Sequence, residues 1–331
     1  MTLSNESTER IALLYRVAKR NGSLITVQEL TRLLPEITSE SEMKDAMASV
    51  PFLNSMFELR SGFLTERFGD PPLDPVVLEA ASRRAARANL IQASRFVSFL
   101  HNSGFQVVAV SGSTSYGSAS VSKDTDLFCV APSRSMWICL TKSLVLARAY
   151  GLVNRGTSRI CISCVMDEGY AREAFGSRRH PLFARDAIEA KVLVGRARYE
   201  SLLRTASWIS DYYPIAYKEI FTGCRATRPQ RDPSSFAKAL NRLLYLGMGT
   251  YLLAKSSLLN LRFKKQGRIG DAFSVRCGED HLIYESRRYL DMKKEYEAAD
   301  SRLRTTSKTL HRAARSNVLP TSKESPTSEL A

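Results

Sequence analysis

The feature of this sequence that most constrains the fold is the segment 107–128. An apolar run, Val-Val-Ala-Val, ends at Gly112-Ser113, and a second glycine, Gly117, follows. Two aspartates separated by one residue then lead into a second apolar run. Short apolar runs bounded by glycine are typical of buried strands. The segment therefore predicts two strands joined by a loop that carries small and acidic side chains.

These side chains have the chemistry of a nucleotide and magnesium site. Gly112 has no Cβ, so the backbone there is able to approach a phosphate closely. Ser113 offers a hydroxyl and an N–H at the start of a short predicted helix, where anions are stabilised. Asp124 and Asp126 alternate on a predicted strand, so both carboxylates point to one face. Such a pair suits Mg²⁺, which is commonly bound by one or two carboxylates together with substrate phosphates.

The pattern Gly-Ser-x₃-Gly-x₆-Asp-x-Asp resembles the signature of the nucleotidyltransferases of the DNA polymerase beta superfamily. Its spacing is similar to that of the minimal nucleotidyltransferases. Segments 133–137 and 184–214 also resemble parts of uncharacterised prokaryotic nucleotidyltransferase-domain proteins. The resemblance covers roughly residues 80–215.

The resemblance implies a fold, an activity and a role for each matching residue. The family moves a nucleotidyl group from an NTP to an acceptor and releases pyrophosphate. By position, Gly112, Ser113 and Gly117 would hold the triphosphate. Asp124 and Asp126 would be catalytic and would bind Mg²⁺ in a two-metal arrangement. The acceptor and the preferred NTP stay open.

One departure from the family pattern leaves the activity open. Active members usually carry a third carboxylate on the next strand. The matching segment here, 159–165, has Cys161 and Ser163 at the candidate positions. Asp167 and Glu168 lie just past that segment and are candidate substitutes. The alternative to an active transferase is therefore a catalytically weak or inactive NTP-binding regulator.

The order of predicted elements indicates an α+β protein with several parts. Three short helices and a hairpin turning at residues 61–62 predict a winged helix-turn-helix over residues 1–72. Alternating helices and strands predict a nucleotidyltransferase sheet domain over residues 73–180. Residues 181–304 predict a helical, basic C-terminal domain, with helices expected at 184–194, 199–212, 236–262 and 280–303. The Ser/Thr/Lys-rich tail, 305–331, predicts disorder.

Charge distribution bears on the partners. The formal net charge is +15; residues 1–72 net −2, whereas residues 218–315 net +11. The basic C-terminal part favours polyanions, so nucleic acid is a candidate partner besides the nucleotide. The predicted winged helix is less suited to DNA, because Glu40, Glu42 and Asp45 accompany Lys44 in its third helix. Protein contact or simple packing is an equal alternative for that domain.

Membrane and redox features are few. The most apolar window, 243–261, is interrupted by Lys255, so it predicts a buried helix and no membrane partner. No secretory signal is evident, and the cysteines are scattered along the chain apart from Cys161 and Cys164. These two features predict a cytoplasmic protein with reduced thiols. The oligomeric state stays open.

Overall fold

The computed structural model describes residues 5–21, 23–34, 39–68, 75–100, 103–117, 124–153, 160–221 and 234–299. The predicted disordered tail, 305–331, lies outside the described residues. So does Lys123, which precedes the first aspartate.

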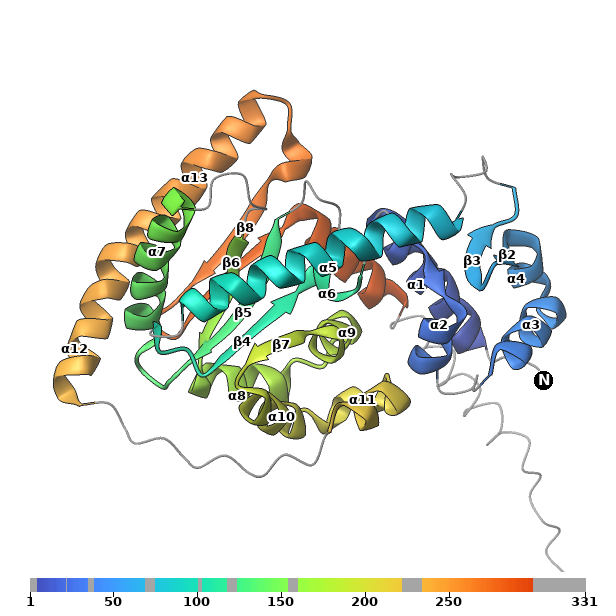
Figure 1. Ribbon diagram of the computed structural model, residues 1–331, viewed down its shortest axis with the longest axis horizontal. Coiled ribbons are helices and arrows are strands. Elements are labelled where there is room, and N and C mark those ends of the chain that lie inside the picture. Colours follow the sequence, from blue (N-terminus) through green and yellow to red (C-terminus); the bar gives the residue numbers. More distant parts are fainter. Residues whose placement is uncertain are drawn as a thin grey trace, which may run out of the picture.

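The N-terminal part is a group of short helices with a small antiparallel sheet (Figure 1). The sheet has the order β1-β3-β2. The elements of the N-terminal part are α1 (Asn5–Asn21), β1 (Ile25–Thr26), α2 (Val27–Leu33), α3 (Glu40–Ser49), α4 (Pro51–Met56), β2 (Phe57–Arg60) and β3 (Phe63–Glu66). A capping box between Thr26 and Glu29 starts α2, with hydrogen bonds of 3.0 and 2.9 Å. Ser61 and Gly62 adopt positive φ and turn the chain from β2 to β3, as the hairpin prediction requires.

A central sheet follows the long helix α5 (Pro75–Phe99). Its first strands alternate with helices: β4 (Val107–Ser111), α6 (Gly112–Ser115), β5 (Thr125–Ala131), α7 (Met136–Val153) and β6 (Ile160–Asp167). β4 is antiparallel to β5, and β5 is parallel to β6. The strands predicted around the glycine-serine turn and the aspartate pair are therefore neighbours in one sheet.

The C-terminal half contributes both helices and strands. The elements are α8 (Glu168–Ser177), α9 (Pro181–Glu189), β7 (Lys191–Val194), α10 (Arg196–Thr205), η2 (Ser207–Asp211), α11 (Pro214–Ile220), α12 (Ser235–Leu244), the π-helical turn η3 (Tyr245–Gly249), α13 (Thr250–Lys265), η4 (Ile269–Asp271), β8 (Phe273–Cys277) and β9 (His281–Ser286). A last helix, called here the C-terminal helix, spans residues 287–299.

Two helix predictions in this half are wrong. Residues 191–194, expected to continue a helix, form β7 and pair with β4. Residues 281–286, expected to be helical, form β9 and pair with β6 and β8. The complete sheet has the order β7-β4-β5-β6-β9-β8. These strands gain ladder hydrogen bonds from partners far away in the sequence, and that gain overrides a weak local preference.

Helices cover both faces of the sheet (Figure 1). Alternate residues of β5 point to opposite faces, so Leu127 and Cys129 pack towards α5 and α7. Phe128 and Val130 pack towards α8 and α10 on the other face. The core therefore has two layers, one on each side of the strands that carry the aspartates.

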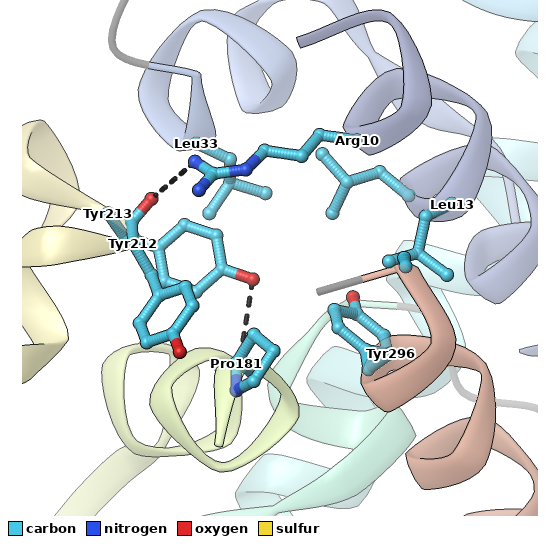
Figure 2. Close-up of a pocket in the computed structure, with 9 residues that line it drawn as sticks. Arg10, Leu13, Leu33, Pro181, Tyr212, Tyr213 and Tyr296 are labelled. Carbon is cyan, nitrogen blue, oxygen red and sulfur yellow. Dashed lines mark hydrogen bonds between the residues drawn. The ribbon is translucent and has the colours of Figure 1, made fainter. Parts of the chain in front are cut away.

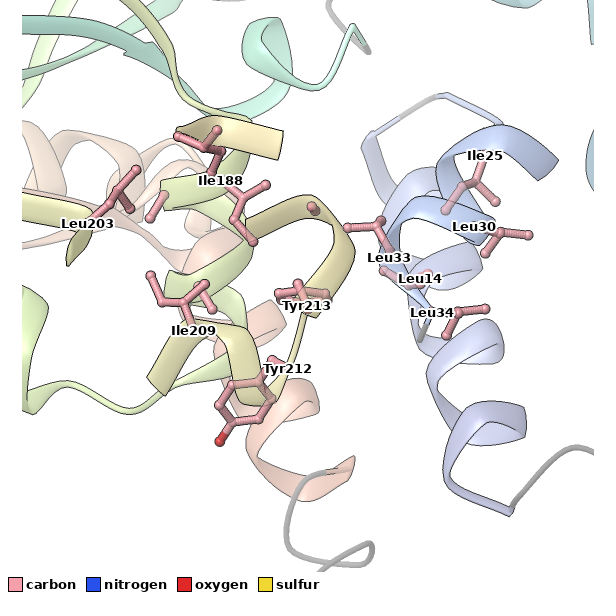
Figure 3. Close-up of a cluster of buried hydrophobic side chains, with 14 of the residues drawn as sticks. Leu14, Ile25, Leu30, Leu33, Leu34, Ile188, Leu203, Ile209, Tyr212 and Tyr213 are labelled. Carbon is pink, nitrogen blue, oxygen red and sulfur yellow. The ribbon is translucent and has the colours of Figure 1, made fainter. Parts of the chain in front are cut away.

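The N-terminal part packs directly on the C-terminal half (Figure 3). Leu14 and Leu33 lie in the same buried cluster as Tyr213. At its edge Arg32 of α2 pairs with Glu189 (2.8 Å) and Glu219 (2.5 Å). The C-terminal helix also packs against α1 through a separate apolar cluster, beside an ion pair between Arg20 and Glu295 (2.5 Å).

The architecture is α+β. Across the described ranges, every helix is too short or too polar to cross a lipid bilayer.

Candidate functional site

The glycine-serine turn connects β4 to β5 through the short helix α6. Gly112 has φ +68° and Gly117 has φ +74°, a backbone conformation that favours glycine at both positions. A Cβ placed on Gly112 would lie 3.3 Å from Oδ2 of Asp126. The backbone of the turn therefore lies directly against the carboxylate, where a larger residue would crowd it. Ser113 follows in α6 and is partly exposed.

Asp124 and Asp126 lie at the start of β5. Asp124 is exposed and directly precedes the strand, whereas Asp126 is half-buried and opposes Ser111 of β4. Burial raises the pKa of Asp126 to about 6, and the negative charge of Asp124 acts in the same direction. The nearby hydroxyl of Ser163 acts in the opposite direction and lowers the pKa. The arrangement is a carboxylate pair whose mutual repulsion a cation would relieve.

A second carboxylate-centred network supports the turn from α9 and was not predicted from the sequence. The hydroxyl of Tyr116 donates a hydrogen bond to Asp186. The hydroxyl of Tyr289, on the C-terminal helix, lies close enough to Asp186 for each to affect the pKa of the other. Burial raises the pKa of Asp186 to about 6, and its charge contributes to the raised pKa of Asp126. The network thus links the turn, α9 and the C-terminal helix.

Arg185 completes this support. Its guanidinium lies over the ring of Tyr116, 4.8 Å from the ring centroid, and donates to the hydroxyl of Tyr296 (3.1 Å). Arg185 is buried. The sequence signal for this network is the pair Arg185-Asp186 within the otherwise apolar run of α9, because adjacent charges on a buried helix require partners.

The position expected for a third carboxylate is occupied by a thiol. Cys161 of β6 is the register partner of Asp126. Burial, followed by the charges of Asp126 and Asp124, raises the pKa of Cys161 to about 12. The thiol therefore stays protonated at neutral pH and does not replace a carboxylate.

Asp167 and Glu168, the candidate substitutes for the third carboxylate, lie at the far end of β6 from the aspartate pair. Asp167 lies six residues beyond Cys161 on β6, about 20 Å along the strand at ~3.3 Å per residue. Its carboxylate caps α8, accepting from the N–H groups of Tyr170 (2.9 Å) and Arg134 (3.1 Å). Glu168 pairs with Arg172 (2.8 Å) at the same distant end of the strand.

The carboxylate pair Asp124 and Asp126 suits one of the common ways in which proteins bind Mg²⁺. Within the described ranges, no group of three or more His, Cys, Asp or Glu side chains is arranged to hold a metal ion. Two carboxylates are nevertheless sufficient where substrate phosphates supply further oxygen ligands. Asp124 and Asp126 are the residues that would hold such an ion.

An apolar pocket of about 410 Å³, a volume that includes its open mouth, lies at the junction of the N-terminal and C-terminal parts (Figure 2). Arg10 donates to the carbonyl of Tyr212 (3.1 Å) at its wall, and the hydroxyl of Tyr213 donates to the carbonyl of Pro181 (3.3 Å). Its lining contains neither the glycine-serine turn nor the aspartate pair. The pocket is thus separate from the candidate site.

Comparison with protein-family models, with curated proteins and with solved structures gave no match.

Proposed function

We propose that this protein is a Mg²⁺-dependent nucleotidyltransferase that moves a nucleotidyl group from an NTP to an acceptor and releases pyrophosphate. The observation that carries the proposal is the approach of the left-handed Gly112 backbone to Asp126, beside Asp124. This juxtaposition of a turn with open backbone and a carboxylate pair suits one ligand, a metal-bound polyphosphate.

Each residue has a distinct task in this proposal. Gly112, Ser113 and Gly117 bind the triphosphate through backbone and hydroxyl groups. Asp124 and Asp126 position the metal, which when bound neutralises phosphate charge and orients the attacking oxygen. The acceptor oxygen forms a bond to the α-phosphorus, and the bond from that phosphorus to the bridging oxygen breaks. The electron pair leaves with pyrophosphate, and the acceptor proton passes to solvent.

The surrounding fold supports the proposal. The run β4-α6-β5-α7-β6, with antiparallel and then parallel pairing, is compatible with a polymerase-beta-type sheet. The N-terminal helices and three-stranded sheet are compatible with a winged helix. Because α2 of this part forms ion pairs with the C-terminal half, packing is the role we propose for that face. The basic C-terminal part leaves nucleic acid as a candidate acceptor.

The test is pyrophosphate release with Mg²⁺ and each of the four NTPs, supplied with candidate RNA, protein and small-molecule acceptors. The matched control is the double variant Asp124→Asn, Asp126→Asn, which keeps side-chain shape and removes both charges. We expect release by the natural protein and none by the variant. Equal release by both proteins would refute the assigned roles.

A second candidate is an NTP-binding regulator without turnover. Two observations favour it: Cys161 occupies the position opposite Asp126, and the nearby Asp186 already accepts a hydrogen bond from Tyr116. Neither Cys161 nor Asp186 then supplies a ready base for a neutral acceptor hydroxyl. This candidate predicts Mg²⁺-dependent NTP binding without pyrophosphate release for every acceptor.

A further inference from the structure

The end of the sheet that carries Asp126 also carries the start of β8. β9 runs antiparallel to β6, so Ser286, at the end of β9, lies towards the start of β6, where Cys161 opposes Asp126. Phe273, at the start of β8, pairs with Ser286. The start of β8 therefore lies at the same end of the sheet as the aspartate pair.

α13 is attached to this end of the sheet. The side-chain amide of Asn260 donates to the carbonyl of Phe273 (2.7 Å), and its oxygen accepts from the N–H of Phe273 (3.1 Å). Figure 1 shows the end of α13 beside the start of β8. β5 and β8 are separated by three strand steps of ~4.8 Å, so the end of α13 begins about 14 Å from the strand that carries Asp126.

Four cationic side chains lie around this point, and we call them the basic patch. They are exposed, and they comprise Arg262, Lys264 and Lys265 in the last turn of α13 and Arg287 just after β9. The N–H of Arg287 donates to the carbonyl of Ala272 (2.9 Å), which directly precedes β8. The basic patch therefore joins the end of α13 to the end of β9.

The charge of the basic patch is not compensated by the described carboxylates. None of its four side chains forms an ion pair within the described residues, whereas the neighbouring Arg268 pairs with Asp271 (2.7 Å) and Arg276 pairs with Glu285 (3.0 Å). The three cations at the end of α13 stabilise that helix dipole. Arg287, however, is the first residue of the C-terminal helix, where a cation is unfavourable to the dipole. Helix stability therefore does not explain its charge, and an external anion does.

We propose that the acceptor is the 3′ end of a nucleic acid strand and that the basic patch binds the phosphates of that strand. This inference rests on the proposed function. The terminal hydroxyl lies at Asp124 and Asp126, and the preceding phosphates follow β6 and β9 to the basic patch. Phosphates are spaced by ~3.4 Å along one strand of a duplex, so about 14 Å corresponds to roughly four nucleotides. The strand thus runs from the basic patch to the aspartates in the 5′ to 3′ direction.

The reaction lengthens the strand by one nucleotide. The oxygen of the 3′-hydroxyl forms a bond to the α-phosphorus of the NTP, and the bond from that phosphorus to the bridging oxygen breaks. Its electron pair leaves with pyrophosphate, and the hydroxyl proton passes to solvent. Because the basic patch contacts phosphates and not bases, we expect binding without sequence preference.

The position of the basic patch favours a long polyanion over a lipid surface. An acceptor that extends over about 14 Å places its hydroxyl at the aspartates while its charges reach the cations. A lipid surface would bind the cations but gives no reason for their place at the aspartate end of the sheet. Leu258 and Leu261 on α13 are exposed, so anionic vesicles are the competing ligand in the test.

The first experiment measures binding of a labelled twelve-nucleotide RNA to the full chain by fluorescence anisotropy in EDTA, over a range of salt concentrations. The patch variant is Arg262→Ala, Lys264→Ala, Lys265→Ala, Arg287→Ala. The matched control removes the same charge from exposed cations elsewhere, and it is Arg16→Ala, Arg95→Ala, Arg179→Ala, Lys218→Ala. Circular dichroism and thermal melting check that each variant is folded.

We expect the natural protein and the control to bind RNA with similar affinity, and the patch variant to bind at least tenfold more weakly. The logarithm of the affinity falls with the logarithm of the salt concentration by ~0.7 for each phosphate contact of a single strand, so the slope of the patch variant should be shallower by about 3. The double variant Asp124→Asn, Asp126→Asn should bind RNA at least as tightly as the natural protein, which separates strand binding from catalysis. Equal RNA binding by the patch variant and the control would overturn the proposal, as would patch-dependent pelleting with anionic vesicles without RNA binding.

The second experiment follows extension of the same RNA, and of DNA with the same sequence, on a gel with Mg²⁺ and each NTP. We expect extension by the natural protein and the control, and at least tenfold less by the patch variant at low strand concentration, with equal calorimetric binding of ATP and Mg²⁺ by all three. Pyrophosphate release with a protein or small-molecule acceptor, without strand extension, would overturn this inference and leave the proposed function intact. Absence of pyrophosphate release with every acceptor would instead refute the proposed function, and the acceptor role with it.

Discussion

Replacing Asp126 by Asn should make the metal-free protein more stable at neutral pH. The carboxyl of Asp126 is half-buried beside Gly112 and faces the charge of Asp124, and its pKa rises from 3.8 to about 6. A raised carboxyl pKa means that the folded state binds the proton more tightly than the unfolded state. The protonated carboxyl of Asp126 therefore contributes its full stabilisation of the folded state below about pH 4, and this stabilisation is lost as the pH rises through about 6.

The size of the effect follows from the shift. About two pKa units at ~1.4 kcal/mol each correspond to about 3 kcal/mol of destabilisation at neutral pH. Asn keeps the shape of the side chain and carries no charge, so Asp126→Asn should recover an increment of that order. Asp186 titrates in the same range, so the difference between the variant and the natural protein is the informative quantity.

The assay is urea unfolding in EDTA at about pH 4 and about pH 8, with stability read from the midpoint and slope. We expect equal stability at the lower pH and a more stable variant at the higher pH. Adding Mg²⁺ with an NTP should stabilise the natural protein and leave the variant unchanged, because ligand binding to the folded state adds stability. A variant that is less stable than the natural protein at about pH 8 in EDTA would show that the Asp126 charge does not destabilise the folded state.

Three further predictions concern the same site. Gly112→Ala should lower the free energy of unfolding by about 1–2 kcal/mol because of the positive φ at this position. It should also abolish NTP binding measured by calorimetry, because the new Cβ would lie 3.3 Å from Asp126. The control Gly62→Ala has a positive φ with open space around it, so it should lose stability and keep NTP binding; equal binding by both variants would contradict the prediction. Tyr116→Phe removes a donor to half-buried Asp186 and should cost about 1–3 kcal/mol in urea unfolding, so an unchanged midpoint would count against the network. Cys161→Asp should tighten Mg²⁺ binding, measured by titration without nucleotide, and unchanged affinity would argue against the register between β5 and β6 at the site.

Local sequence patterns were sufficient for several elements of the N-terminal part and for the strands beside the candidate site. The capping box at Thr26, the Ser61-Gly62 turn and the apolar runs around Gly112 each depend on residues within a few positions of one another. β4 and β5 are consecutive strands and pair with each other, as consecutive strands commonly do. Such features can be predicted from the sequence because the interactions that stabilise them join residues only a few positions apart.

The remaining features depend on contacts that no local pattern contains. β9 forms because β6 and β8 lie on either side of it, although its own residues suggested a helix. Asp186 reaches Tyr116 across 70 residues of sequence, and the fold of α9 against the turn creates that contact. Asp167 is far from the aspartate pair because a strand is extended. Six residues of β6 separate it from Cys161, so closeness in sequence does not bring the two side chains together.

Calorimetric titration with ATP, in the presence of Mg²⁺ and in EDTA, tests directly whether Asp124 and Asp126 hold a metal-bound nucleotide against the glycine-serine turn. It requires no knowledge of the acceptor. We expect binding by the natural protein in Mg²⁺, little or none in EDTA, and loss of binding in the double variant Asp124→Asn, Asp126→Asn. Equal Mg²⁺-dependent binding by that variant would contradict the claim.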